Sequence, residues 1–367
     1  MIERPPAPPP SGGWRRWVSN LLTALVAAGL CLPVLELGLR IVLPAPTAYR
    51  ALPPNLTASF WLKNARGVAG PSSYRVNSMG ARSREWDDNR RREYRVLCMG
   101  GSTTESLVND QSRAWTTLLE QELGTLADGR RVWVGNIGRS GWSTRHHRLQ
   151  ARHLLGVYDP QVVVVLAGVN DLASRLKQGS DYDPRYLEKP ERQATLVRQS
   201  FAVAPGRFAS EWHDDPWLKR TRLWQLLRRL KYGVADQPDE FQDPEGRYLQ
   251  RWRAARARGG RLAELPPLEG ALDEYAENVL EIVRLARAHG ARILLMTQPV
   301  LWREDLDEDE KASLWMGGVG EFRRSPRSSY YEPAALARAI DAYNERLLQV
   351  CARSGAECLD LAAGVAR

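Results

Sequence analysis

The stretch that decides the fold runs from Val162 to Ala167 and reads VVVVLA. An uninterrupted apolar run rich in β-branched residues is typical of a strand buried on both faces of a parallel sheet. Two similar runs precede it, YRVLCM at 94–99 and RVWVGNI at 131–137, and two follow it, at 293–297 and 357–361. The sequence therefore predicts five strands.

Segments suited to helices lie between these strands, at residues 113–124, 144–156, 271–289 and 333–353. Gly156 and Gly290 are expected to end two of them, and Pro333 lies in the first turn of the last. Strands that alternate with helices form right-handed βαβ units. We therefore expect a three-layer α/β domain over residues 94–367, with a parallel sheet at its centre.

Residues 172–270 interrupt the alternation, because they are rich in Arg, Trp and helix-breaking prolines. We interpret them as an inserted cap with two or more helices. Their densest basic run contains Arg251, Arg253, Arg256, Arg258 and Arg261. Two interpretations of this run stay open: a solvated helix face, or a surface that contacts an anion, a lipid headgroup or a polysaccharide.

The N-terminal part predicts a membrane anchor. A Pro-rich tail at 1–16 precedes a largely apolar segment at 17–43, and about 20 residues are enough to cross a bilayer. A cleaved signal peptide and a buried helix are the alternatives, but the apolar stretch is longer than a signal core. Arg15 and Arg16 favour a cytoplasmic N-terminus and a main domain in the periplasm, joined by an irregular entry segment at 44–93.

Composition excludes several classes of protein. The 367 residues are 43% hydrophobic and 26% charged, unlike a disordered or collagen-like chain. The net charge of +9 suits anionic surfaces, but a domain outside the cytoplasm would meet no nucleic acid. The four cysteines form no C-x-x-C pair, so we expect no zinc site. Cys98 is expected to be a buried thiol, and a Cys351–Cys358 disulfide is conceivable outside the cytoplasm.

Chemically active residues follow the first three strands, whose carboxyl ends meet at one edge of a parallel sheet. Ser102, after Gly100-Gly101, is the candidate nucleophile near a helix N-terminus. Gly141 offers a backbone N–H, and Asn170 offers a side-chain amide. Together with the N–H of Ser102, these donors could stabilise the oxyanion of an acyl-transfer reaction.

The three blocks resemble those of the SGNH hydrolases, also called GDSL-type esterases and lipases. The matching segments are Met99–Thr104, Asn136–Gly141 and Gly168–Asp171. The resemblance implies a flavodoxin-like sheet and hydrolysis of an ester, often on a lipid or sugar, without metal or cofactor. Tyr74–Arg82 (YRVNSMGAR) also resembles the lead-in segment of membrane-anchored members.

One block of the family is missing. Its Asp-x-x-His, which supplies the base after the fifth strand, has no counterpart, and no histidine follows His289. We expect either a truncated chain or a protein without the usual base. His147 and His213 are the alternative bases, and the ordinary interpretation of each is a packing or surface residue.

The sequence thus predicts a membrane-anchored serine esterase that deacylates a cell-envelope glycan or lipid. Ser102, Gly141 and Asn170 are its candidate catalytic residues, and Asp171 is expected to brace its loop. An O-acyltransferase acting on a polysaccharide would use the same covalent intermediate. A non-catalytic glycan-binding protein is the third hypothesis, because of the missing base and the Arg- and Trp-rich insertion.

Overall fold

The computed structural model describes residues 13–42, 48–63, 68, 70–87, 89–202, 221–224, 226–227, 241, 243–323, 325 and 328–365. The chain divides into two compact units. The first comprises Met1–Thr47 and Pro205–Asp236, and the second comprises Ala48–Ala204 and Gln237–Arg367. Parts of the predicted tail, entry segment and insertion therefore lie outside the described residues.

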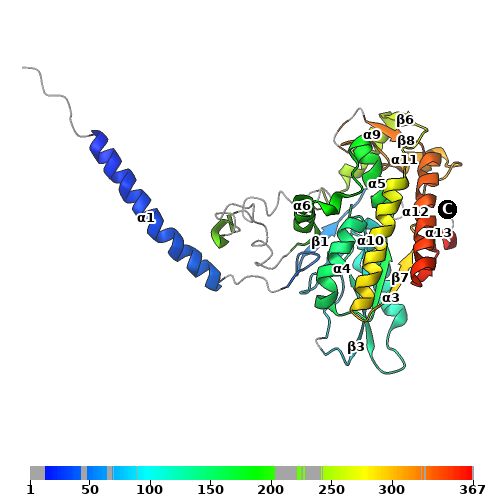
Figure 1. Ribbon diagram of the computed structural model, residues 1–367, viewed down its shortest axis with the longest axis horizontal. Helices are drawn as coiled ribbons and strands as arrows, with labels where there is room; N and C mark the ends of the chain where they lie inside the picture. Colours follow the sequence, from blue (N-terminus) through cyan, green and yellow to red (C-terminus); the bar gives the residue numbers. More distant parts are fainter. Residues whose placement is uncertain are drawn as a thin grey trace, which may run out of the picture. The chain divides into compact units, whose positions relative to one another are not determined.

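The first unit contains the long helix α1 (Gly13–Val42), which begins before the expected residue 17 (Figure 1). By length and composition, its part Arg16–Val42 is able to cross a membrane. Near its end, Glu36 pairs with Arg40 at 2.8 Å and accepts the backbone N–H of Arg222 at 2.9 Å. The carboxylate of Glu36 thus has partners at the C-terminal end of the apolar segment, where charged residues interrupt it.

The second unit is built on one parallel sheet of five strands, in the order β4-β3-β5-β7-β9. This order is 2-1-3-4-5 by position along the chain, which is the flavodoxin-like arrangement. The predicted strands and fold class are therefore confirmed. The strands are β3 (Glu93–Gly100), β4 (Arg131–Asn136), β5 (Val162–Leu166), β7 (Arg292–Met296) and β9 (Glu357–Leu359).

Helices cover both faces of the sheet because its side chains are apolar on both sides. Side by side on one face lie α4 (Thr144–Tyr158), α10 (Glu269–Ala288) and α12 (Pro333–Ser354) (Figure 1). On the other face, α3 (Trp115–Leu123) and α13 (Leu361–Gly364) contribute Trp115, Leu119 and Leu361 to a core cluster with strand residues such as Val96 and Val164. The expected three layers are present.

Of the two predicted helix ends, the one at Gly156 was wrong and the one at Gly290 was confirmed. Helix α4 continues through Gly156 to Tyr158 and ends at Asp159, which adopts the left-handed conformation with φ 46°. Helix α10 ends at Ala288, and Gly290 follows its cap with φ +73°. A glycine within a helix is tolerated where neighbouring side chains pack well, so position alone did not locate the end of α4.

The expectation of an irregular entry segment was wrong for its described part. Strands β1 (Thr57–Phe60) and β2 (Ser72–Arg75) pair antiparallel, and Phe60 and Tyr74 are buried. Four-residue strands carry too little alternation to be recognised in sequence, and their burial comes from contacts with the rest of the domain.

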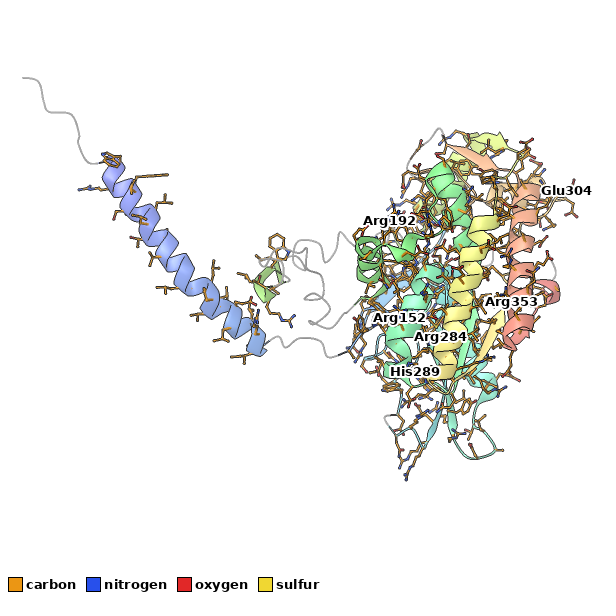
Figure 2. All side chains as sticks on the ribbon, in the orientation of Figure 1. Arg152, Arg192, Arg284, His289, Glu304 and Arg353 are labelled. Atoms are coloured by element: carbon orange, nitrogen blue, oxygen red, sulfur yellow. A yellow bond between two sulfur atoms is a disulfide. The ribbon has the colours of Figure 1, made fainter. Side chains whose placement is uncertain are left out.

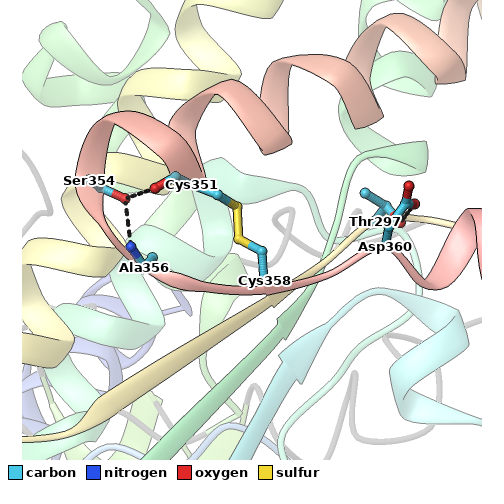
Figure 3. The surroundings of a disulfide bond; sticks show 6 residues. All are labelled: Thr297, Cys351, Ser354, Ala356, Cys358 and Asp360. Carbon is cyan, nitrogen blue, oxygen red and sulfur yellow. Dashed lines mark hydrogen bonds between the residues drawn. A yellow bond between two sulfur atoms is a disulfide. The ribbon is translucent and has the colours of Figure 1, made fainter.

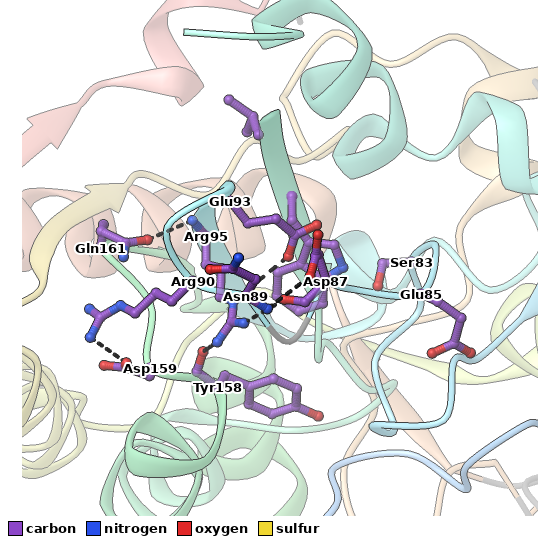
Figure 4. A network of polar contacts seen from close by, with 12 residues as sticks. Ser83, Glu85, Asp87, Asn89, Arg90, Glu93, Arg95, Tyr158, Asp159 and Gln161 are labelled. Carbon is purple, nitrogen blue, oxygen red and sulfur yellow. Dashed lines mark hydrogen bonds and ion pairs between the residues drawn. The ribbon is translucent and has the colours of Figure 1, made fainter. Parts of the chain in front are cut away.

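A polar network fixes the last part of the entry segment at the amino end of the sheet (Figure 4). Arg95, almost fully buried, donates to the carbonyl oxygens of Asp87 and Tyr158 at 2.9 and 3.2 Å. Its backbone N–H donates to Gln161 at 2.6 Å. These contacts cover the amino end of the sheet. The loops that carry the candidate site lie at the opposite, carboxyl end.

The described part of the insertion contains α5 (Val169–Gln178), α6 (Pro190–Ser200) and α9 (Arg247–Arg258), with 3-10 turns at Gly179–Asp181 and Tyr186–Glu188. Strand β6 (Gly260–Leu262) pairs with β8 (Ser329–Tyr331), and α11 (Glu308–Ser313) lies near α9.

The arginine run of α9 is only partly a solvated face. Arg256 is 3% exposed and donates to the carbonyl oxygens of Met316 and Tyr331 at 2.6 and 2.7 Å. Arg253 donates to the carbonyl oxygen of Ser313 at 3.0 Å. These two arginines hold the segment that follows α11, a role that no spacing of charges along the chain reveals.

A disulfide joins Cys351, in the last turn of α12, to Cys358 in the edge strand β9 (Figure 3). Next to it, Thr297 donates its hydroxyl to Asp360 at 2.7 Å, and Asp360 caps α13. Cys98 is a buried free thiol, as expected. The bridge and the hydrogen bond together hold the last strand on the sheet.

Candidate active site

The candidate site lies at the carboxyl end of the sheet, where the strand order reverses. Strands β3 and β5 are neighbours, but the connections that leave them pass to opposite faces. Ligands of open α/β sheets bind in the crevice at such a point. Ser102 follows β3 and Asn170 follows β5, so the topology brings these two predicted residues together.

Ser102 is the first residue of a one-turn helix, α2 (Ser102–Glu105), and its side chain is exposed. The turn fits only because Gly100 has no side chain. A Cβ there would lie 2.1 Å from Thr104 Oγ1 and 2.5 Å from the carbonyl oxygen of Leu166. The glycine thus lets the chain turn sharply off the strand and present the hydroxyl outward.

Gly141 lies in the loop after β4 with φ +81°, a conformation that favours glycine. The loop is attached to the turn at Gly100–Glu105 at two points. The backbone N–H of Arg139 donates to Gly100 at 3.0 Å, and the buried carboxylate of Glu105 accepts both the N–H and the hydroxyl of Ser140 at 2.6 Å. Gly141 is exposed, so its backbone faces the surface beside the turn.

Asn170 connects the third loop to the other two. Its Nδ2 donates to the carbonyl oxygen of Trp142 at 2.8 Å, next to Gly141. A Cβ on Gly101 would lie only 2.3 Å from the same nitrogen. The Asn170 amide therefore contacts the backbone immediately before Ser102. The structure brings all three predicted loops together.

Asp171 supports the candidate site from the interior of the domain. Its buried carboxylate accepts the backbone N–H of Thr144 at 3.0 Å and also the hydroxyl of Thr144. This contact attaches the start of α4 to α5. Burial raises the pKa of Asp171 to about 7, against the lowering effect of the Thr144 donors.

A buried ion pair lies one residue further along α4. Arg145 donates to both carboxylate oxygens of Glu274 at 2.6 and 2.8 Å, and Tyr182 donates its hydroxyl to the same carboxylate. The pair cannot be recognised in the sequence, because its members are 129 positions apart.

Arg82, the last residue of the lead-in segment Tyr74–Arg82, supports the site, and no local sequence pattern indicates that role. It is 1% exposed and donates to the carbonyl oxygens of Glu105, Ser106 and Asn109 at 2.5–2.8 Å. The guanidinium also lies 4.7 Å from the ring centre of Tyr74. Burial lowers the pKa of Arg82, partly offset by Tyr74 and Glu105. Arg82 therefore holds the C-terminal side of the turn at Gly100–Glu105.

The two histidines near the carboxyl end of the sheet have partners other than Ser102. His146 Nδ1 accepts the backbone N–H of Ser143 at 3.2 Å, and its ring stacks on Trp142. His147 is buried, with Nδ1 2.9 Å from Gln150 Oε1. Burial lowers the pKa of His146 to about 3 and that of His147 to about 4, so both rings are neutral at pH 7.

Of the histidines that the structure describes, none is hydrogen-bonded to Ser102. The other alternative base, His213, lies outside the described residues. The ordinary packing interpretation of His147 agrees with its burial.

Several solved structures resemble this chain at low sequence identity. Axe2, an acetylxylan esterase from Geobacillus stearothermophilus, is 14% identical over 74% of this chain and 77% of its own, with a TM-score of 0.34. TesA is 15% identical over 72% and 76%, with a TM-score of 0.32. LAE5, an alpha/beta hydrolase enzyme from the metagenome of Lake Arreo, Spain, is 14% identical over 74% and 78%, with a TM-score of 0.33.

Among curated proteins, none matches the chain. The model of the GDSL-like lipase/acylhydrolase family matches residues 98–367, well over half of the sequence. The matched region begins within β3, just before Ser102, and includes all three blocks on which the resemblance was based. The chain therefore belongs to the GDSL-like lipase/acylhydrolase family.

Proposed function

We propose that this protein is a membrane-anchored serine esterase that removes acyl groups from a cell-envelope glycan or lipid. Family membership supports the ester-hydrolase class. The observation that carries the residue assignment is the position of the Asn170 amide against Gly101, directly beside the exposed hydroxyl of Ser102. A nucleophile and an oxyanion donor from different strands thus share one small region of the sheet edge.

In this proposal the Oγ of Ser102 attacks the ester carbonyl, and the carbonyl oxygen becomes an oxyanion. The backbone N–H groups of Ser102 and Gly141 and the second hydrogen of Asn170 Nδ2 stabilise it, at about 3 kcal/mol for each donor. The proton of the Ser102 hydroxyl passes to the leaving alcohol, and water then hydrolyses the acyl-serine to release the acid and restore the hydroxyl. The hydrogen bond from Asn170 to Trp142 holds the amide in position before the substrate arrives.

One further feature suits a membrane anchor, and another suits a location outside the cytoplasm. Helix α1 carries exposed Trp14 and Trp17 at its start, and tryptophan is enriched where a helix leaves the bilayer. The Cys351–Cys358 disulfide is of a kind that persists in oxidising compartments. An alkaline phosphatase fused to the C-terminus should therefore be active, whereas a cytoplasmic domain would leave the fusion inactive.

A fluorophosphonate probe tests the nucleophile directly on the full chain in detergent micelles. Labelling is expected for the wild type, is lost in Ser102→Ala, and slows about 100-fold or more in Asn170→Ala. Ser180→Ala, which removes an exposed hydroxyl outside the site, serves as the control and should label normally. Absence of labelling in the wild type would favour the non-catalytic glycan-binding hypothesis instead. Equal labelling of Ser102→Ala would refute Ser102 as the nucleophile.

A further inference from the structure

A cavity of about 540 Å³ borders two of the candidate oxyanion donors, Gly141 and Asn170. Its walls come from the start of α4, from α5 and α6, and from the segment at 316–323. A substrate whose ester carbonyl lies against the donors would extend into this space. The cavity is therefore placed to hold the part of the substrate that adjoins the ester.

His146, in the first turn of α4, lines the cavity together with Gly141 and Asn170. Its Nδ1 accepts the backbone N–H of Ser143 at 3.2 Å, which completes the capping box of α4. Its ring stacks on Trp142, with the ring centres 5.4 Å apart and the planes 11° apart. The carbonyl oxygen of Trp142 is also the acceptor for the Asn170 amide. The ring of His146 is thus held in one orientation, on the loop that carries the candidate donor Gly141.

The contact with Ser143 decides which ring nitrogen of His146 carries the proton. A backbone N–H can only donate, so Nδ1 is the acceptor, and a neutral ring carries its proton on Nε2. The ring is neutral at pH 7, because burial, and to a smaller extent the charges around it, lowers the pKa of His146 to about 3. At neutral pH the Nε2–H of His146 is therefore an uncharged hydrogen-bond donor.

This Nε2–H has no hydrogen-bond partner among the residues that the structure describes, because the contacts of His146 with Ser143 both involve Nδ1. It is not sealed in the interior either, in contrast to Nε2 of His147, which is buried. A donor on a ring that is already fixed loses little side-chain entropy when it binds a ligand. His146 thus presents an oriented donor to the cavity.

The charged groups of the wall do not identify the ligand, because Arg145 is paired with Glu274 and Lys177 with Glu321. An uncharged donor such as the Nε2–H of His146 suits an uncharged oxygen, which is a hydroxyl, an ether or a carbonyl. In the acyl part of a simple ester the carbonyl oxygen is the acceptor, and in the proposed mechanism the oxyanion donors bind it. The partner of His146 therefore belongs to the alcohol part of the ester.

We propose that His146 is a substrate-binding residue, whose Nε2–H donates a hydrogen bond to an oxygen on the alcohol part of the ester. This inference rests on the proposed function and names its substrate class. The substrate is an ester of an alcohol that carries further oxygen atoms near the reacting one, as a sugar does, and not an ester of a hydrocarbon alcohol.

Two substitutions separate this role from the capping of α4. In His146→Asn, Oδ1 takes the place of Nδ1 and still accepts the N–H of Ser143, but no atom takes the place of Nε2. In His146→Gln, the amide group reaches the position of Nε2, and glutamine at this helix position also completes a capping box. A purely structural role thus predicts equal effects of the two substitutions, whereas a substrate contact predicts that glutamine restores what asparagine loses.

Binding is measured by ligand-observed NMR titration on the full chain in nanodiscs, with Ser102→Ala as the background so that nothing is hydrolysed. One probe is a methyl glucoside that carries an acetyl group on its primary hydroxyl. The other is cyclohexylmethyl acetate, which has the same acyl group and a ring without oxygen, and empty nanodiscs give the blank. His146→Asn should weaken binding of the glucoside about fivefold or more and change that of the cyclohexyl ester less than about twofold. His146→Gln should restore most of the loss.

His289→Asn is the matched control, because His289 is exposed at the C-terminal end of α10 and does not line the cavity (Figure 2). It should leave binding of the glucoside unchanged. Equal losses in His146→Asn and His146→Gln would overturn the inference, and so would an unchanged affinity in His146→Asn. An equal loss for both probes, or no measurable binding of the glucoside to the background variant, would overturn it too.

The two proposals fail separately, because binding is measured without catalysis. Binding of the glucoside that depends on His146, without fluorophosphonate labelling of the wild type, would refute the esterase and keep His146 as a ligand-binding residue. Labelling of Ser102, together with unchanged binding in His146→Asn, would refute the role of His146 alone.

Discussion

Replacement of Arg145 by methionine should strongly destabilise the domain, because it leaves a buried carboxylate without its cation. The side chains of Arg145 and Glu274 are 7% and 6% exposed. Two charge-assisted hydrogen bonds join them, at 2.6 and 2.8 Å. In Arg145→Met, only the hydroxyl of Tyr182 would still donate to that carboxylate.

The magnitude follows from these contacts. Loss of two hydrogen bonds to a charged group costs about 3–6 kcal/mol. A buried carboxylate that has lost its cation can become neutral by binding a proton. Protonation costs about 1.4 kcal/mol of free energy for each pH unit above the ordinary glutamate pKa of about 4.3. The variant therefore loses at most about 4 kcal/mol of unfolding free energy at pH 7 and about 1 kcal/mol at pH 5. This loss grows with pH because the folded variant retains a proton that its unfolded chain releases.

Urea unfolding followed by circular dichroism, at pH 5 and pH 7, measures both values on the full chain in detergent. The double variant Arg145→Met, Glu274→Leu removes both charges and should be more stable at pH 7 than the single variant. The reasoning is refuted by a penalty below about 1 kcal/mol at pH 7. A penalty that does not change with pH, or a double variant as unstable as the summed single changes, would refute it too.

Three further predictions concern the supports of the site. Arg82→Met should lower the unfolding free energy by about 3 kcal/mol and slow fluorophosphonate labelling of Ser102, and unchanged labelling would contradict its role in the turn. Asp171→Asn removes a carboxyl whose pKa rises from 3.8 to about 7 in the folded protein. The stability of the wild type relative to this variant should therefore fall by about 4 kcal/mol between pH 4 and pH 7 and stay level above, as urea titrations would show. Reduction of the Cys351–Cys358 bridge, which spans seven positions, should cost about 2 kcal/mol, and an unfolding midpoint unaffected by dithiothreitol would argue against it.

Much of the sheet was predictable because a strand buried on both faces needs a continuous apolar run. Val162–Ala167 meets that requirement throughout, and three of its companions meet it at most positions. The fifth segment, 357–361, contains Glu357 and Asp360, and its strand β9 is exposed. The candidate residues Ser102, Gly141 and Asn170 were predictable for a related reason, since each directly follows such a strand. Their catalytic roles remain predictions, and the fluorophosphonate experiment tests them.

The supports of the site were not predictable from the sequence. Arg82 lies in a segment expected to be a linker, and it holds the turn that contains Ser102. Arg256 is buried, although the arginines near it in the sequence suggest a solvated helix face. A buried arginine is recognisable only when the carbonyl oxygens that satisfy it are known, and those oxygens belong to distant segments.

Local sequence thus determined which segments become strands of the central sheet, where the chain turns sharply, and which end of the domain carries the polar loops. Only the tertiary structure decided the strand order β4-β3-β5-β7-β9, and with it the contact between Asn170 and Gly101. The physical reason is range: backbone preference and hydrophobic periodicity act over a few residues, whereas the pairing of strands and the desolvation of charged groups depend on partners far away in the chain.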